Sequence, residues 1–293
     1  MQGIIIENIS SLYKVKSGEN VYTTTARGKF KKEEISPVVG DLVEIVEVNQ
    51  EKQEAVIDEI LPRKNYVKRP KVANISQLIF VLSSKHPKPD LLMLDKQLAF
   101  AEYLNIKVII VLNKIDLDKE TDFKQIKKIY ENVGYKVIET QANEGRGVKE
   151  LVKLMKNNIN VFSGNSGVGK STLINAIFEN NVTLEGEISK KNKRGKNTTT
   201  SVKIYEIDKE TFIADTPGFS TFEISEIESK ELENCFKEFR IYIQNCEFVG
   251  CTHIKEKKCG IKKAVEEGKI SSDRYDRFVK IYSELKDKEN RKW

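Results

Sequence analysis

The chain has 293 residues, of which 39% are hydrophobic and 32% charged, and a formal net charge of +6. This length suffices for two or three domains. The longest purely aliphatic run, residues 108–112, is far below the roughly 20 apolar residues that a membrane span needs. The N-terminus has no basic leader followed by an apolar core. We therefore expect a cytoplasmic protein without membrane contact. Nothing in the sequence suggests an obligate interface, so we expect a monomer when free.

Residues 1–66 predict a small closed β-barrel. Short apolar runs occur at residues 4–6, 12–15, 21–25, 42–48 and 55–60, and turn-forming segments at 17–20 and 37–40 separate some of them. Among small barrels of five strands, the OB-fold is the commonest one that binds nucleic acid. We therefore expect an OB-fold-like, RNA-binding barrel here.

Residues 67–228 alternate between strand and helix patterns. Strand-like runs lie at 75–82, 106–112, 135–139 and 159–163, and helix-like segments at 91–104, 121–133 and 148–157. Such alternation predicts βαβ units and a mainly parallel sheet covered on both faces. Open sheets of this class bind their ligands where strands end.

A complete phosphate-loop motif, G-x-x-x-x-G-K-[ST], follows the predicted strand 159–163 and precedes a predicted helix at 171–178. Glycines allow the backbone amides to point at phosphate groups. Lys170 would neutralise the β- and γ-phosphates, and the Ser171 hydroxyl would bind Mg²⁺. The predicted loop residues are Gly164, Asn165, Ser166, Gly167, Val168, Gly169, Lys170, Ser171 and Thr172.

Two further motifs complete a predicted GTP site. The segment Asn113-Lys114-Ile115-Asp116 matches the N-K-x-D pattern that reads guanine, because the carboxylate of Asp116 accepts from both N1–H and the N2 amino group. Asp215, after a strand-like run at 211–214, is expected to hold Mg²⁺ through water, and the Gly218 amide to sense the γ-phosphate. The N-K-x-D segment precedes the phosphate loop by about fifty residues, whereas it follows that loop in ordinary GTPases. The order predicts a circularly permuted GTPase.

The parts that would hydrolyse GTP are less fully specified. Thr198, Thr199 or Thr200 is expected to complete the Mg²⁺ shell, with Thr199 preferred. Phe219 stands near the position where many GTPases carry a water-orienting glutamine, so we expect slow intrinsic turnover. Residues 140–142 are either the loop that backs the guanine or an ordinary turn.

Residues 229–293 predict helices at 229–244 and 261–290 around a cysteine cluster. Cys246, Cys251, His253 and Cys259 gather three thiols and one imidazole within fourteen residues. Such a set predicts one closed, tetrahedral, structural Zn²⁺ site. Zinc would stabilise a small helical domain with little core of its own.

Three basic clusters favour a polyanionic partner, which in a GTPase points to RNA. The alternative is that these side chains are ordinary solvated residues. They are Arg63, Lys64, Lys68, Arg69 and Lys71; Lys190, Lys191, Lys193, Arg194 and Lys196; and Lys255, Lys257, Lys258, Lys262 and Lys263.

Together these motifs resemble the RsgA family of circularly permuted GTPases, which act on the small ribosomal subunit. The resemblance covers essentially the whole chain and rests on the motif order and the cysteine spacing, with barrel residues 27–29 and 37–41 in support. It implies an OB-like barrel at 1–66, a permuted GTPase domain at 67–228 and a zinc-binding helical domain at 229–293. It also implies GTP hydrolysis stimulated by the small (30S) subunit late in its maturation, with contacts to its rRNA near the decoding region.

One position departs from the family pattern. The family commonly reads Gly-x-His-Thr-Thr in the first switch, with that histidine proposed as catalytic, whereas Asn197 stands there in this chain. Asparagine orients water but is no base at neutral pH. Either Asn197 takes a weakened version of the role or a ribosomal group supplies it.

Two other functions remain open from the sequence. Because of Asn197 and Phe219, the chain could instead be a GTP-gated RNA-binding checkpoint protein with negligible turnover. A GTPase of metal or membrane trafficking is disfavoured, because three thiolates and a histidine leave no open position on zinc.

Overall fold

The computed structural model describes residues 1–32, 35–118, 122–181, 202–215 and 224–291. The chain forms two compact units, each assembled from several segments. The first comprises Met1–Ile79, Ala142–Ser163 and Lys170–Thr221, and the second comprises Phe80–Gln141, Gly164–Gly169 and Phe222–Trp293. Domain boundaries at residues 66 and 228 remain a prediction.

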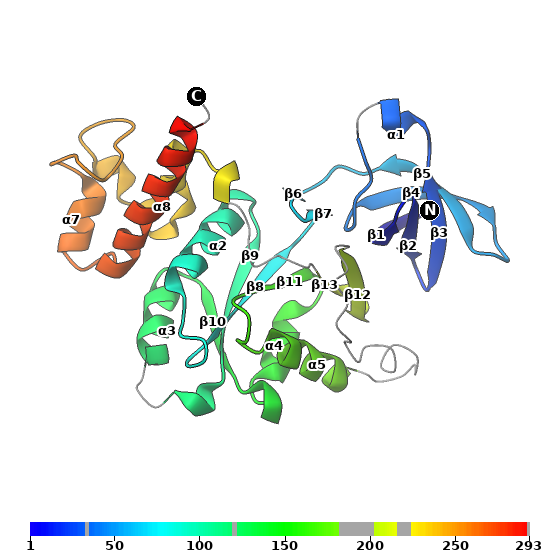
Figure 1. The fold of residues 1–293 in the computed structure, drawn as a ribbon, viewed down its shortest axis with the longest axis horizontal. Coiled ribbons are helices and arrows are strands. Elements are labelled where there is room, and N and C mark those ends of the chain that lie inside the picture. The colour runs from blue at the N-terminus through cyan, green and yellow to red at the C-terminus, as the bar shows by residue number, and fades with distance from the viewer. Residues whose placement is uncertain (33–34, 119–121, 182–201, 216–223, 292–293) are drawn as a thin grey trace. The chain divides into compact units, whose positions relative to one another are not determined.

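The first unit begins with the predicted five-stranded barrel (Figure 1). Its strands are β1 (Gln2–Ile9), β2 (Leu12–Ser17), β3 (Asn20–Ala26), β4 (Leu42–Asn49) and β5 (Glu54–Ile60). The neighbours run β1-β2-β3-β5-β4, and β4 pairs back with β1, which closes the barrel. Inward-facing Ile5, Val15, Val43 and Ile57 are fully buried, as the alternation of strand side chains requires. The short helix α1 (Lys29–Lys32) lies between β3 and β4.

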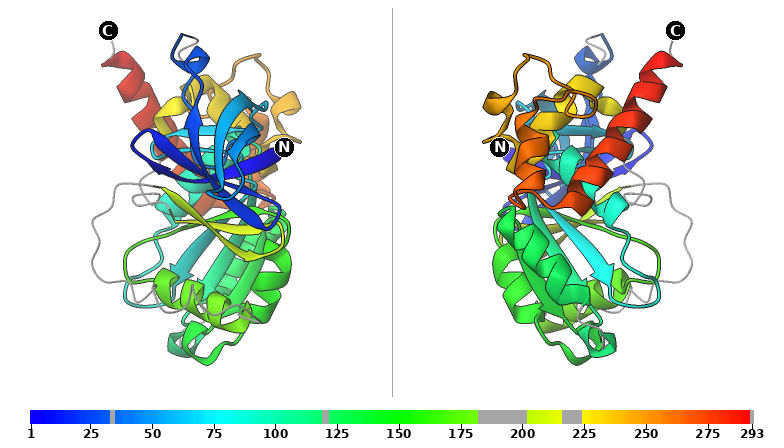
Figure 2. Two further views of the ribbon diagram at one scale, coloured as in Figure 1. Left: turned by 90° about the vertical axis from the view of Figure 1, so that its right-hand side faces the viewer. Right: turned by 90° about the vertical axis from the view of Figure 1, so that its left-hand side faces the viewer.

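The rest of the first unit carries strands and helices from the middle of the chain. They are β6 (Tyr66–Lys68), β7 (Lys71–Ala73), the 3-10 turn η2 (Ala142–Glu144), α4 (Val148–Met155), β11 (Ile159–Ser163), α5 (Lys170–Asn181), β12 (Lys203–Asp208) and β13 (Thr211–Asp215). Strand β11 pairs in parallel with β13, β13 pairs antiparallel with β12, and β12 pairs antiparallel with β1 of the barrel. One sheet therefore runs from the β11–β13–β12 set into the barrel (Figure 2).

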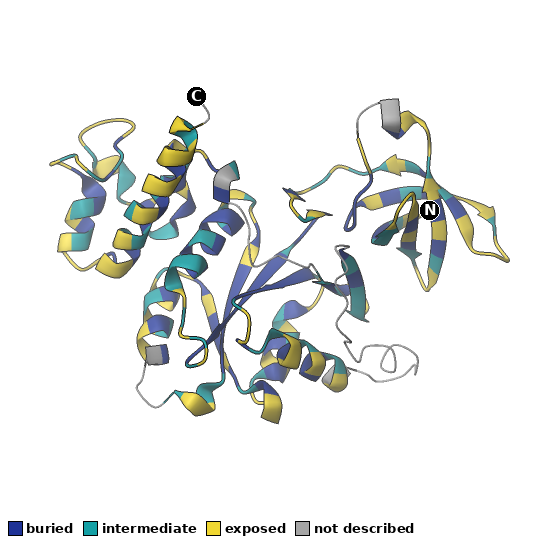
Figure 3. Ribbon diagram, in the orientation of Figure 1, coloured by how far each residue is buried: buried dark blue, intermediate teal, exposed yellow. Residues whose placement is uncertain are grey.

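The second unit contains the other part of the predicted α/β fold. Its elements are α2 (Leu91–Tyr103), β9 (Lys107–Asn113), the 3-10 turn η1 (Ile115–Leu117), α3 (Asp122–Asn132) and β10 (Lys136–Thr140). Strand β8 (Gln77–Ser83) also belongs to it from Phe80 onward. The strand order is β10-β9-β8, and β9 and β10 are parallel. Strands β8 and β9 are buried almost throughout (Figure 3), as expected for strands covered on both faces.

The C-terminal segment of the second unit packs around three aromatic rings. Phe236, Phe239 and Phe278 lie with ring centroids 4.8 to 5.2 Å apart. The elements are the 3-10 turns η4 (Ile224–Glu226), η5 (Ser229–Cys235), η6 (Lys237–Phe239) and η7 (Ile243–Asn245), and the helices α7 (Gly260–Glu266) and α8 (Ser272–Asn290).

The prediction of one helix at 229–244 was wrong, because three 3-10 turns occupy that stretch. Phe236, between η5 and η6, has an extended backbone with φ of −103° and ψ of 103°, which interrupts any helix at this point. The predicted helix at 261–290 is two helices, separated after α7 by Gly268, whose φ of 69° ends a helix readily. Among the described residues, no helix is long and apolar enough to cross a membrane.

Candidate nucleotide site and metal centre

Asn113 connects the N-K-x-D segment to the phosphate loop within the second unit. It ends β9 with 1% of its surface exposed. Its Nδ2 donates to the Val168 carbonyl at 2.9 Å, and its Oδ1 accepts from the Thr140 hydroxyl at 2.9 Å. A buried amide held from both sides fixes the loop that would surround a base. Segments 55 positions apart in sequence are thus in direct contact.

Lys114 makes a second connection of the same kind. Its Nζ donates to the Gly167 carbonyl at 2.7 Å and to the His86 carbonyl at 3.0 Å. The Ser84 hydroxyl donates to the Lys114 carbonyl at 3.1 Å and so holds the backbone. Asp116, two residues on, is exposed on η1. Asp116 is therefore open to solvent, while the Lys114 ammonium is held in place by two carbonyls.

Two glycines of the loop, Gly164 and Gly169, leave no room for a side chain. A Cβ on Gly169 would lie 2.4 Å from Asn113 Nδ2, and one on Gly164 would lie 2.2 Å from the Val81 carbonyl oxygen. Gly164, Gly167 and Gly169 have φ values of 131°, 82° and 98°, which L-residues rarely adopt. The residues present therefore fit a loop that wraps a phosphate chain with its amides.

The first unit contributes the remaining described parts of the motif set. Lys170, Ser171 and Thr172 begin α5, and Asp215 ends β13. Ser171 and Thr172 are exposed, while burial lowers the pKa of the Lys170 ammonium. A helix start of this kind favours anionic ligands.

Several predicted site residues lie outside the described residues. They are Asn197, the candidate Mg²⁺ ligands Thr198, Thr199 and Thr200, the candidate γ-phosphate sensor Gly218, and Phe219. Their roles stay predictions.

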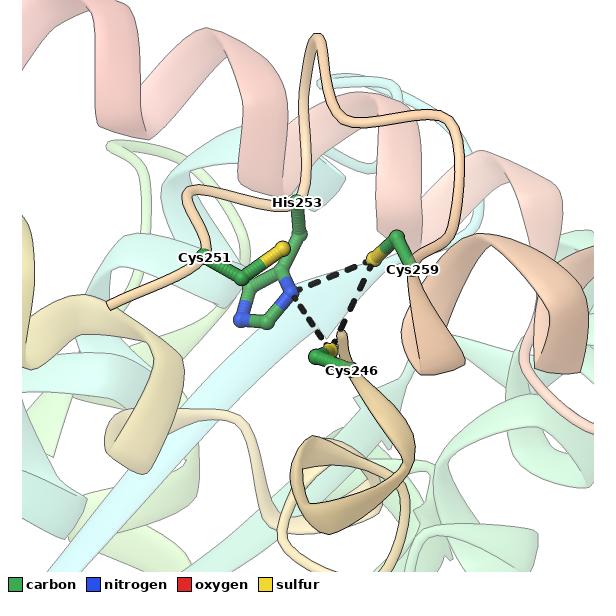
Figure 4. A group of neighbouring side chains, drawn as sticks. All are labelled: Cys246, Cys251, His253 and Cys259. Atoms are coloured by element: carbon green, nitrogen blue, oxygen red, sulfur yellow. Dashed lines mark hydrogen bonds between the residues drawn. The ribbon is translucent and has the colours of Figure 1, made fainter. Parts of the chain in front are cut away.

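The predicted metal ligands converge in the second unit (Figure 4). The ligand atoms of Cys246, Cys251, His253 and Cys259 all lie within 4.8 Å of one another. Nδ1 of His253 lies 3.3 Å from Cys259 Sγ and 3.6 Å from Cys246 Sγ, and the two sulfurs are 3.9 Å apart. Tetrahedral zinc with bonds of about 2.0 to 2.3 Å spaces its ligand atoms similarly. The residues therefore fit a zinc ion.

A carboxylate from outside the cluster orients the histidine. Nε2 of His253 lies 2.5 Å from Glu233 Oε2, so Nε2–H donates to the carboxylate and Nδ1 faces the sulfurs. Tyr275 Oη donates to the His253 carbonyl at 2.6 Å. Glu256 organises the ligand loop by accepting from the amides of Thr252, Ile254 and Lys255 and from the Thr252 hydroxyl.

Two basic clusters of the sequence have partly structural roles. Arg63 makes two bonds to Asp41, a fully buried carboxylate, so it stabilises the barrel. Lys258 pairs with Glu247, and Lys262 donates to two carbonyls of the metal loop. Lys255 and Lys257 are exposed. The cluster at 190–196 lies outside the described residues.

The comparisons with known proteins agree with this geometry. The model of the RsgA GTPase family matches residues 60–225, and that of the RsgA N-terminal domain matches residues 2–57. The chain belongs to the RsgA GTPase family. The expected resemblance is thereby confirmed, as is the fold class of barrel, permuted α/β GTPase and C-terminal cysteine-histidine module.

Two relatives within the family match over at least 94% of their length. A protein of Clostridium botulinum (strain 657 / Type Ba4) named "Small ribosomal subunit biogenesis GTPase RsgA" is 41% identical over 296 residues, covering 100% of both chains. One of the same name from Ruminiclostridium cellulolyticum is 42% identical over 287 residues, covering 97% of this chain and 94% of its own.

Two solved structures share the fold. YjeQ from Thermotoga maritima matches with a TM-score of 0.84 and 35% identity, covering 97% of this chain and 98% of its own. YloQ, described as a circularly permuted GTPase, matches with a TM-score of 0.82 and 32% identity, covering 98% of this chain and 95% of its own.

Sequence reasoning missed two contributors to these sites. Thr140 was singled out only within a candidate guanine loop, whereas its hydroxyl binds the Asn113 side chain. Glu233 gave no signal, because an acidic residue twenty positions before a histidine is unremarkable without the fold.

Proposed function

We propose that this RsgA-family protein is a GTPase that binds the small ribosomal subunit and hydrolyses GTP, stimulated by that subunit, during late subunit maturation. The observation that carries the nucleotide part is the pair of bonds from Asn113 and Lys114 to the phosphate-loop carbonyls. Because the two motifs that recognise base and phosphates support one another, a guanine nucleotide is the ligand that suits them. The names of the relatives support the ribosomal part.

The residues would divide the work as follows. Asp116 accepts from the guanine edge, while the Lys114 stem lies along the base. Amides of Gly167 and Gly169, with Lys170, bind the phosphates. Ser171 and Asp215 would hold Mg²⁺, directly and through water, together with one of Thr198, Thr199 and Thr200. Mg²⁺ held by these residues would supply positive charge that offsets the charge developing on the phosphate oxygens. Gly218 would sense the γ-phosphate and Asn197 would orient the attacking water.

A single structural Zn²⁺ would bind Cys246, Cys251, His253 and Cys259. The set is closed, so it stabilises the fold and offers no position to a substrate. We also propose that the exposed lysines of the metal loop and the barrel contact rRNA. The protein would act in the cytoplasm as a monomer when free.

Phosphate release measured with protein alone, with small subunits, with large subunits and with free RNA tests this function. We expect acceleration by small subunits only, weakening as salt rises. Asp116→Asn tests the nucleotide site directly. An amide in place of the carboxylate suits xanthine, which offers one donor and one acceptor at that edge, so preference should move from GDP to XDP. If wild-type protein binds ADP and GDP with equal affinity in magnesium buffer, the proposal is contradicted.

A checkpoint protein with negligible turnover is the second candidate, because Asn197 replaces the family's usual histidine. Such a protein binds small subunits tightly in the GTP state without accelerated phosphate release.

The Asn197→Ala variant separates two sources of the water-orienting group. Unchanged stimulated hydrolysis assigns it to the ribosome.

A further inference from the structure

Four charged residues stand in one row across four neighbouring strands of the first unit. Lys14 on β2 is opposite Glu7 on β1, Glu7 is opposite Lys203 on β12, and Lys203 is opposite Asp215 on β13. Directly opposed residues of antiparallel strands project from the same face of the sheet. The row therefore alternates positive and negative charge from β2 of the barrel to the end of β13, where Asp215 lies.

Glu7 stands between two ammonium groups. Its carboxylate lies 3.1 Å from Lys203 Nζ and 3.7 Å from Lys14 Nζ. The side chain of Glu7 is 17% exposed, against 40% for Lys203 and 46% for Lys14. Because Glu7 is less exposed than either lysine, its carboxylate holds the two ammonium groups in place.

Lys203 has an acid on either side of it. Opposed Cβ atoms in an antiparallel pair lie roughly 4.5 to 5.5 Å apart, well within the reach of a lysine side chain. In the structure the ammonium binds Glu7 on the barrel side and lies 5.4 Å from the centre of the Tyr205 ring. Without Glu7, the same ammonium is attracted to Asp215.

We propose that Glu7 and Lys203 are positioning residues for the Mg²⁺ site. Glu7 holds the Lys203 ammonium on the barrel side and so keeps it from neutralising Asp215. The inference rests on the proposed function, in which Asp215 holds Mg²⁺. It adds that the barrel, through a residue of β1, sets the Mg²⁺ concentration at which the nucleotide is retained.

The test measures release of a fluorescent GDP analogue against free Mg²⁺ concentration. We expect Glu7→Gln to raise the half-saturating Mg²⁺ concentration by up to about fivefold. This factor corresponds to the free energy of a strong surface ion pair. Lys203→Met should leave it unchanged or lower it. The double variant should need no more Mg²⁺ than wild type, since no ammonium is left to compete.

Glu206→Gln is the matched control. Glu206 on β12 also pairs with the barrel, through Lys16 at 3.0 Å, but it is opposite Phe212 instead of Asp215. It should leave the Mg²⁺ dependence unchanged, and thermal unfolding checks that every variant is folded. If the Lys203→Met protein or the control needs as much extra Mg²⁺ as Glu7→Gln, the effect comes from a general loosening of the fold around these strands. That result overturns the inference. An unchanged Glu7→Gln protein also overturns it, while the proposed function stands if wild-type protein binds GDP.

Discussion

The side-chain amide of Asn113 donates to the backbone carbonyl of Val168, across 55 positions of sequence. In the permuted order Asn113 comes first, yet the bond makes the N-K-x-D segment and the phosphate loop one structure. Permutation changes the loops that connect strands, while the contacts at the strand ends stay possible. The glycines of the phosphate loop are what allow so close an approach.

Gly169→Ala should abolish tight GDP binding, because its Cβ would meet Asn113 Nδ2 at 2.4 Å in a backbone with φ of 98°. Gly134→Ala is the matched control, since Gly134 has a φ of 95° and nothing within 4 Å of the added Cβ. The control should cost about 1 kcal/mol of unfolding free energy and no GDP affinity. Calorimetric titration with GDP checks both. Equal GDP affinity in the two variants would contradict the steric argument.

Glu233→Gln should weaken zinc binding roughly 10- to 100-fold, because the amide no longer supplies the charge that orients His253 and raises its basicity. Competition with a chromogenic chelator measures the affinity. Glu231→Gln, in the same 3-10 turn, is the control and should bind zinc like wild type. If both variants hold zinc equally well, the carboxylate has no part in the metal centre.

Arg274 should be the most costly charge to remove from the C-terminal segment. It is 1% exposed, donates to Asp95 and Glu238, and lies over the rings of Tyr130 and Phe236. Arg274→Met removes the cation that pairs with Glu238 and leaves Asp95 with Arg277 alone, so the unfolding free energy should fall by about 3 kcal/mol.

Urea titration of the Arg274→Met protein measures this loss. Lys280→Met, on the exposed face of the same helix α8, should stay within about 0.5 kcal/mol of wild type. A loss no larger than that of the control would mean that the buried pairs contribute nothing net.

What the sequence predicted was local. The phosphate loop and the four metal ligands are each nearly contiguous, so their chemistry is readable from spacing alone. Contacts that depend on strand register, such as the opposition of Lys203 to both Glu7 and Asp215, need the partner strands to be known. Strand β12 itself was not predicted, although apolar and polar residues largely alternate over residues 202–208.

The charge cluster around Arg274 was unpredictable for a related reason. Asp95 belongs to α2 and is 179 positions away from Arg274 in sequence. An acidic residue and a basic residue on separate amphipathic helices are expected on solvated faces. Only the packing of α8 against α2 turns them into a buried pair.

Glu256 should make the metal loop sensitive to acid. Burial disfavours its charged form, but hydrogen bonds from Thr252, Ile254 and other loop amides outweigh this and lower the pKa of the carboxyl to about 2. Because the folded-state pKa lies below the ordinary value of 4.5, the ionised group stabilises the fold above about pH 4.5. That contribution is lost as the pH falls toward 2.

Glu256→Gln should therefore lower the unfolding free energy by about 1 kcal/mol at pH 7, a value reduced for the solvent-screened position of the group. The difference from wild type should shrink between pH 4.5 and pH 2, as wild-type Glu256 becomes protonated. Urea titrations of both proteins at each pH measure it, and any loss of metal at low pH is common to the two. Glu266→Gln, exposed on α7, is the control and should show no such pH dependence. A Glu256→Gln deficit that stays constant from pH 7 to pH 3 would mean that the carboxylate's charge does not hold the loop.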